Sequence, residues 1–375
     1  MDRLGLSQSD LRAYQQALAW THQRRVHVQI LDLDMNPLRW LTPMVLDGQV
    51  TIDTQADVTR TLTLTFLDPN QALAFEPDSP GPALWRNRLI RVIDSVQVAA
   101  LNRWVDCAVF TGPVWDFSRQ GAVVNVTAKG MEALAMGQAW VPHTYPAKSN
   151  RTHALKDIMG RVGDDCHAIP DLAYRFPKHF TVSRMDQPWK RAQKIAHSMN
   201  RYLFYDGHGT LHLRQFADKP VFTFDSELLA PPTFSRSKDP IINTVEVVGA
   251  KPKGQKRRVR AVATAPGWLS PSSLGRGSTS MRLVEQVQND HIRSNHEAQQ
   301  VANRHIKRHE QQRVTVGFDS LPVPHLQEHD RAQVRADGLG LVRFRMAQWT
   351  IPLGSGDGAP MTVGSTRRTT AVRHG

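Results

Sequence analysis

The sequence contains very little cysteine and no long hydrophobic run, and each absence excludes a class of protein. Only Cys107 and Cys166 occur among its 375 residues, too few for a disulfide framework or a four-cysteine zinc site. No stretch approaches the roughly 18 consecutive apolar residues of a membrane-spanning helix. Residues 1–25 lack the apolar core of a signal peptide. We therefore expect a protein that is made in a reducing cytoplasm and has no membrane span.

Acidic residues are scarce relative to basic ones. The chain has 34 aspartates and glutamates against 47 lysines and arginines, a formal charge of +13. Such an excess attracts nucleic acid, an anionic membrane or an acidic protein. The densest basic cluster lies in residues 251–260, where no aromatic residue stands between the cations. A solvated loop on an oligomer surface is the interpretation we adopt. Contact of residues 251–260 with DNA or with an acidic partner stays open as the alternative.

Motifs of known catalytic chemistry are missing from the sequence. Gly354-Ser355-Gly356 superficially resembles part of a nucleophile elbow, but no helical pattern follows it. The glycine pairs near 160–163 and 275–277 lack the lysine and the strand–helix context of a phosphate-binding loop. We predict no catalytic, cofactor-binding or metal-binding residues.

Sixteen histidines raise the possibility of a metal site. His305 and His309 have the i, i+4 spacing that places two imidazoles on one helix face, yet a zinc-protease helix needs Glu where Ile306 stands. His296 has Gln300, not a second histidine, four residues later. Because we find no third ligand nearby, we interpret these histidines as a solvated polar helix face.

Two further polar groups resemble catalytic pairs. In the run Asp164-Asp165-Cys166-His167 a thiol and an imidazole are adjacent, but neighbours in sequence usually point apart. We therefore expect a loop there. Asp32 and Asp34 lie at a strand end before a turn, where they cap the backbone more often than they catalyse.

The first part of the chain has the alternation of β-strands. Thr61, Thr63 and Thr65 alternate with Leu62, Leu64 and Phe66, the period of a half-buried strand. Further strands are expected at residues 26–30, 50–52, 89–93, 104–110, 114–117 and 122–127. Turns are expected at 111–113 and 119–121. Many short strands at this spacing imply a sandwich or a barrel.

The middle of the chain has an α/β pattern. Thr152 is expected to cap a helix that ends at Gly163, and a second helix is expected after an Asp186 N-cap, with the apolar stripe of Trp189. Strands at 202–205 and 211–214, separated by Asp-Gly-His-Gly, predict a hairpin.

From residue 216 the pattern is mainly β again. Strands are predicted at 221–224, 244–248, 314–318, 332–335, 341–350 and 361–368. Ser294 and Glu297 form a capping box for a helix near 294–309. We expect a helical arm at 1–23, a first β-barrel domain at 24–130, an α/β insertion at 131–215 and a second β-barrel domain at 216–375.

Four places, in this order, resemble a phage tail hub protein, the structural part of tail-associated minor tail proteins. That family is similar to the baseplate hub proteins of contractile tails. The matching places are Asp57-Val58-Thr59-Arg60-Thr61-Leu62-Thr63-Leu64 with Asp68-Pro69; Val109-Phe110-Thr111-Gly112-Pro113-Val114 leading to Val124–Gly130; the Trp189 helix before Tyr205-Asp206-Gly207; and Pro324-His325-Leu326 with Asp330, then Met361-Thr362-Val363.

The resemblance implies a mainly β fold in which two β-barrel-like tube domains bracket a small α/β domain. It implies a homotrimer that adapts the hexameric tail tube to the tip and closes or opens the DNA channel. The implied partners are the distal tail protein ring, the tape measure protein, receptor-binding or fibre proteins and, transiently, phage DNA. The implied location is the tail tip of a virion assembled in the host cytoplasm. A tail-associated cell-wall hydrolase and a basic nucleic-acid-binding module are the alternatives.

Overall fold

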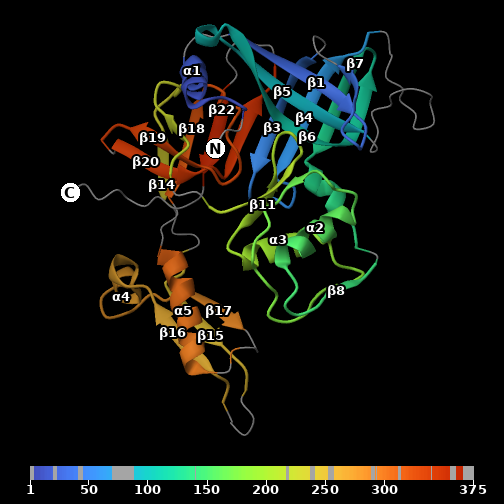
Figure 1. Cartoon of the computed structure of the whole chain (residues 1–375). Coiled ribbons are helices and arrows are strands. Elements are labelled where there is room, and N and C mark those ends of the chain that lie inside the picture. Colours follow the sequence, from blue (N-terminus) through green and yellow to red (C-terminus); the bar gives the residue numbers. More distant parts are fainter. Residues whose placement is uncertain are drawn as a thin grey trace. The chain divides into compact units, whose positions relative to one another are not determined.

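The computed structural model describes residues 4–19, 23–40, 45–69, 88–139, 141–216, 219–236, 241–251, 257–288, 292, 294–310, 314–338, 340–354 and 360–365. Its chain forms two compact units (Figure 1). Unit 1 contains Met1–Pro232, Gly317–Leu341 and Arg345–Ser365, and unit 2 contains Thr233–Val316 with Val342–Phe344. None of the described helices is long and apolar enough to cross a membrane.

Unit 1 is mainly β. Its helices are α1 (Gln8–Leu18), α2 (Arg151–Gly160) and α3 (Pro188–Ser198), with 3-10 turns at Ala99–Leu101 and Met131–Ala135. Its strands are β1 (Arg24–Leu31), β2 (Pro37–Trp40), β3 (Val45–Asp53), β4 (Arg60–Leu67), β5 (Leu89–Val98), β6 (Arg103–Gln120), β7 (Val123–Lys129), β8 (His143–Tyr145), β9 (His167–Ala168), β10 (Phe180–Val182), β11 (Tyr202–Tyr205), β12 (Leu211–Arg214), β13 (Phe222–Phe224), β19 (Arg331–Ala336), β21 (Gln348–Pro352) and β22 (Met361–Ser365). Strands β18 (Val314–Ser320) and β20 (Gly340–Arg345) contain residues of both units.

One large sheet organises unit 1. Its strand order is β18-β22-β21-β3-β4-β7-β6-β5-β1-β2. Strand β21 pairs antiparallel with β3, from Gln348 opposite Asp53 to Pro352 opposite Gln49. The C-terminal strands (red in Figure 1) therefore extend the sheet of the N-terminal strands (blue). The order of the described strands does not close into a ring. The two predicted barrels therefore stay a prediction.

The predicted turn at Thr111-Gly112-Pro113 is wrong. Residues 103–120 form the single strand β6, which pairs with β5 as far as Pro113 and with β7 from Val114 onward. Proline cannot donate a ladder hydrogen bond, so it is tolerated where the strand changes partner. Gly112 is required there because a Cβ would lie 1.9 Å from the Lys129 carbonyl oxygen.

The α/β part of unit 1 has its own core. Trp189, Ala192, Ile195, Ala196 and Met199 are buried, which confirms the predicted stripe. The Trp189 ring stacks on Tyr205 with centroids 5.6 Å apart. This contact fixes α3 against the predicted hairpin, which is present as β11 and β12.

Two predicted helix caps are wrong. Asn150, not Thr152, caps α2, because its Oδ1 accepts from the backbone N–H of Thr152 at 2.8 Å. Helix α2 ends at Gly160. The residue before α3 is Gln187, while Asp186 accepts from the Ser183 N–H at 2.6 Å.

The sequence correctly predicts the helix near the N-terminus of unit 1 but not the strand boundaries near its C-terminal end. The N-terminal helix is confirmed as α1, with Tyr14 and Leu18 buried. The predicted strand at 341–350 is two strands, because Met346 and Ala347 are buried between β20 and β21 and the Met346 N–H donates to the Asp330 carbonyl.

Unit 2 is a small α/β unit. It contains β14 (Thr233–Arg236), β15 (Thr244–Val248), β16 (Arg260–Thr264), a 3-10 turn at Gly267–Leu269, α4 (Pro271–Leu274), β17 (Val284–Gln288) and α5 (Asn295–Glu310). Strand β15 lies between antiparallel β16 and parallel β17. Ala298, Ala302 and Ile306 of α5 are buried in the unit's core. The Glu297 N–H donates to Ser294 Oγ at 3.1 Å, which confirms the predicted N-cap.

Candidate functional site

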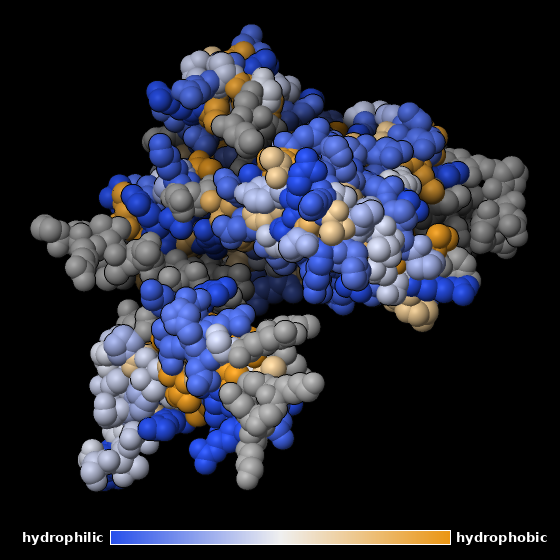
Figure 2. Space-filling view, turned by 60° about the horizontal axis from the view of Figure 1, so that its bottom comes forward, coloured by the Kyte–Doolittle hydropathy of each residue, from blue (hydrophilic) through white to orange (hydrophobic). Residues whose placement is uncertain are grey.

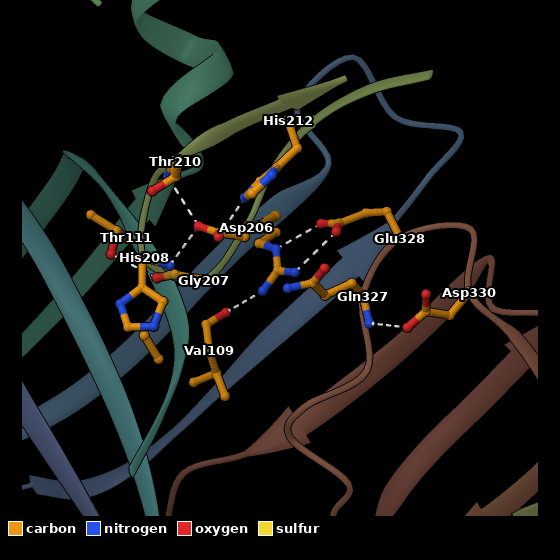
Figure 3. A network of polar contacts seen from close by, with 12 residues as sticks. Val109, Thr111, Asp206, Gly207, His208, Thr210, His212, Gln327, Glu328 and Asp330 are labelled. Atoms are coloured by element: carbon orange, nitrogen blue, oxygen red, sulfur yellow. Dashed lines mark hydrogen bonds and ion pairs between the residues drawn. The ribbon is translucent and has the colours of Figure 1, made fainter. Parts of the chain in front are cut away.

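A polar network in unit 1 brings together all four places that carry the tail-protein resemblance. Figure 3 labels its members from β6, the β11–β12 turn, β12 and the segment before β19, and Arg60 of β4 completes it. We call this network the polar joint. Its residues are Arg60, Val109, Thr111, Asp206, Gly207, His208, Thr210, His212, Gln327, Glu328 and Asp330.

The centre of the polar joint is a buried ion pair. Arg60 donates from Nε to Glu328 Oε1 at 2.7 Å and from Nη2 to Oε2 at 3.0 Å, and both side chains are at most 4% exposed. Burial opposes the charge on Arg60, but the attraction of Glu328 outweighs it and raises the pKa of Arg60. Arg60 Nη1 also donates to the Val109 carbonyl. Loss of one partner would leave an unpaired buried charge, a cost of about 3–5 kcal/mol.

The turn of the β11–β12 hairpin docks against β6. Thr111 Oγ1 donates to the Gly207 carbonyl at 2.7 Å. A Cβ on Gly207 would lie 1.8 Å from the Ala108 carbonyl oxygen, so only glycine permits this approach. The backbone N–H groups of His208 and Thr210 donate to Asp206 Oδ1. The turn is thus held both internally and by the sheet.

Asp206 joins the turn to β12. Its Oδ2 lies 2.7 Å from His212 Nε2. Burial alone would raise the pKa of Asp206, but the hydrogen bond with His212 and the donated backbone N–H groups lower it. Asp206 therefore accepts hydrogen bonds as a carboxylate, which suits a structural anchor.

The segment before β19 closes the other side of the polar joint. Arg214 Nη1 donates to Gln327 Oε1 at 2.6 Å, and the Gln327 N–H donates to Asp330 Oδ2 at 2.9 Å. A small pocket lies here, with an empty volume of about 300 Å³ that includes open solvent. The space open to a water-sized molecule is only about 10 Å³, far below the volume of small-molecule sites. Its lining is Leu4, Arg60, Cys107, Ala108, Gly207, His208, Pro324, His325, Leu326 and Gln327.

A second buried carboxyl lies in the 3-10 turn after β7. Glu132 is fully buried, and hydrogen bonds from its own backbone and from the Thr59 side chain only partly offset its loss of water. Burial raises its pKa to about 7. The Glu132 side chain is therefore largely neutral in the folded chain below pH 7, and its burial costs the fold more as the pH rises from 4.5 to about 7.

The predicted histidine face lies in unit 2, where His296 is exposed, as expected, but His305 and His309 are half-buried. Glu285 of β17 contacts both imidazoles, at 2.6 Å from His309 Nε2 and 3.5 Å from His305 Nδ1. Burial alone would raise the pKa of Glu285, but these hydrogen bonds outweigh it and lower the pKa. No group of three or more potential metal ligands in metal-binding geometry occurs in the described parts of the chain.

The other predicted polar groups support local structure. Asp164 accepts a hydrogen bond from the Tyr205 hydroxyl, and its Oδ1 accepts from the Cys166 N–H. Asp32 accepts from the backbone N–H of Asn36 at 2.8 Å, as the predicted turn requires. Ser355 and Gly356, with residues 252–256 of the basic cluster, lie outside the described residues.

The polar joint holds together segments that lie far apart in the sequence. Its carboxylates are engaged by arginine, histidine or backbone donors, and no serine or cysteine nucleophile contacts a histidine within it. The sequence reasoning missed Arg60, Glu132 and Glu328. A signal for Arg60 existed, because it occupies the same strand face as Leu62 and Leu64.

Solved structures show which proteins share this fold. The 43 kDa tail protein of prophage MuSo2 from Shewanella oneidensis matches with a TM-score of 0.61 and 12% identity, over 92% of this chain and 98% of that chain. The tail protein from Neisseria meningitidis matches with a TM-score of 0.61 and 11% identity, over 92% and 97%. Prophage tail protein gp18 from Listeria monocytogenes matches with a TM-score of 0.53 and 10% identity, over 91% and 95%.

The chain therefore has the fold of prophage tail proteins over most of its length. The predicted resemblance is confirmed at the level of the fold. No protein-family model matches the sequence, and no curated protein matches it significantly.

Proposed function

We propose that this chain is a non-enzymatic structural hub protein at the distal tip of a phage tail. The observation that carries the proposal is the shared fold with two tail proteins, over 92% of this chain and nearly all of each tail protein. The polar joint adds support, because it uses charged residues to hold distant segments together. A rigid subunit of this kind suits a protein whose work is done by its surfaces.

In the proposed assembly the chain is a homotrimer. Residues 24–130 and 216–375 supply two tube domains, so that three chains present six, and residues 131–215 brace them. The ring adapts the hexameric tail tube to the tip and closes or opens the DNA channel. Its partners are the distal tail protein, the tape measure protein and the receptor-binding or fibre proteins, and it joins the virion in the host cytoplasm.

An exposed sheet edge supports contact between subunits. Strand β2 ends the strand order of the main sheet. Leu38 and Trp40 on it are 46% and 54% exposed. Exposed apolar side chains of this kind can enter an interface with another chain, and an obligate contact buries more than about 2,000 Å².

The test of location is immunogold electron microscopy of the phage particles with an antibody against this chain. We expect the label at the distal end of the tail. Label on the head, along the tail or nowhere on intact and opened particles would contradict the proposal.

A further inference from the structure

The positive charge of the chain is concentrated in unit 2. Residues 233–316 hold 15 of the 47 lysines and arginines but only 6 of the 34 aspartates and glutamates, a formal charge of +9. Residues 1–232 hold 25 and 23, a formal charge of +2. Less than a quarter of the chain therefore carries most of its +13.

The cations of unit 2 face solvent. Eight lysines and arginines of Thr233–Val316 have a described exposure, and all eight are exposed: Lys251, Arg257, Arg258, Arg260, Arg276, Arg282, Arg304 and Lys307. Figure 2 shows hydrophilic residues (blue) over much of unit 2, in the lower part of the view, around a smaller apolar area (orange). Exposure leaves these cations accessible to a partner.

Two described carboxylates of unit 2 are already engaged within the unit. Glu246 accepts from Arg260 at 3.2 Å and from Gln286 at 2.9 Å. Glu285 contacts His305 and His309. Internal pairing therefore compensates little of the excess charge.

Unit 1 shows the opposite arrangement. Its arginines commonly pair with acids, as in Arg24–Asp94, Arg119–Asp68 and Arg191–Asp186, each at 2.6 Å. Since its charge is nearly balanced, a second copy of this chain offers no surplus of acids to neutralise unit 2. The complementary partner is a different molecule with a high density of negative charge.

Exposed cations of unit 2 occur near both ends of α5, which suits an extended anion. The Arg260 N–H contacts Asn295 at the start of α5, whereas Arg304 and Lys307 lie in its last turns. Asn295 and Lys307 are separated by about 18 Å along the helix axis. Duplex DNA presents about ten phosphate charges over that length. Six of the eight exposed cations are arginines, which suit phosphate.

We propose that unit 2 is a nucleic-acid-binding unit that contacts the phosphate backbone of duplex DNA without reading its sequence. The contacts come from the eight exposed cations of its described part, among them Arg257, Arg282 and Lys307. This inference depends on charge and exposure within unit 2 and does not require the trimer.

The test is fluorescence anisotropy of the full-length protein with a labelled duplex of about 30 base pairs. We expect affinity to fall at least about tenfold between 50 and 200 mM NaCl, as two or more phosphate contacts require. The double variant Arg257→Glu, Lys307→Glu should bind at least about tenfold more weakly at 100 mM NaCl. Arg282→Glu, in another segment, should weaken binding independently.

The matched control is the double variant Lys178→Glu, Lys194→Glu, which changes the charge equally at exposed positions of unit 1. It should stay within about threefold of wild type. Salt-independent binding, no binding at 50 mM NaCl, or equal losses in both double variants would overturn the proposal. Competition by polyglutamate as effective as that by DNA would instead assign unit 2 to an acidic protein.

Discussion

Arg60 shows what the sequence can reveal about a single buried charge and what it cannot. Alternation along β4 puts the Arg60 side chain on the face of Leu62 and Leu64, so the burial of Arg60 could be predicted from the sequence. Its partner Glu328 could not be predicted, because 268 residues separate the two and no local sequence pattern links them. A charged residue on the buried face of a strand predicts that an oppositely charged partner exists, but the sequence does not show which residue it is.

Glu132 gives the chain a pH-dependent stability. Its pKa is raised to about 7 in the folded state from 4.5, so the folded state binds the proton more tightly than the unfolded state. Its carboxyl costs little below pH 4.5, and the cost grows as pH rises through 7. We expect unit 1 to lose up to about 3 kcal/mol between pH 4.5 and pH 8 from this group.

Denaturant unfolding across that pH range measures the effect. Glu132→Gln should flatten the decline in stability between about pH 4.5 and 7, whatever its effect on stability at pH 4.5. Asp116→Asn, at an exposed position of β6, should keep the wild-type profile. A Glu132→Gln profile that parallels wild type would show that this carboxyl does not titrate in the folded chain.

At the scale of elements, the β11–β12 turn is the most sensitive part of the polar joint. Gly207→Ala would place a methyl group 1.8 Å from the Ala108 carbonyl oxygen. Backbone must then move, and we expect a loss of about 2–3 kcal/mol in the free energy of unfolding.

Gly137→Ala is the matched control, because a Cβ there meets nothing within 4 Å. Its unfolding free energy should stay within about 0.5 kcal/mol of wild type. Equal stability of the two variants would mean that the turn does not dock closely on β6.

Local patterns predicted elements well where one face is buried. The alternation of apolar and polar residues correctly predicted β4, and apolar residues at helical spacing correctly predicted α3. Errors occurred where tertiary contacts override local signals. Gly112 and Pro113 resemble a turn but lie inside β6, because the strand passes there from β5 to β7. Asn150 caps α2 in place of Thr152.

At the scale of the whole molecule, the order of elements predicted more than any single motif. The four matched places meet in the polar joint, although each is only a turn or an alternation by itself. The pairing of β21 with β3 was not predictable, since it joins strands nearly 300 residues apart in the sequence. Nor was the approach of Glu285 to His305 and His309. Contacts of this range depend on the folded topology.

The central claim, a trimeric hub, is tested most directly by the mass of the purified full-length protein across a dilution series. Mass photometry and sedimentation should give about three times the 42.2 kDa of one chain, and the trimer should persist on dilution as an obligate contact does. A monomer of 42.2 kDa at every concentration, with no trimer in assembled particles, would contradict the account.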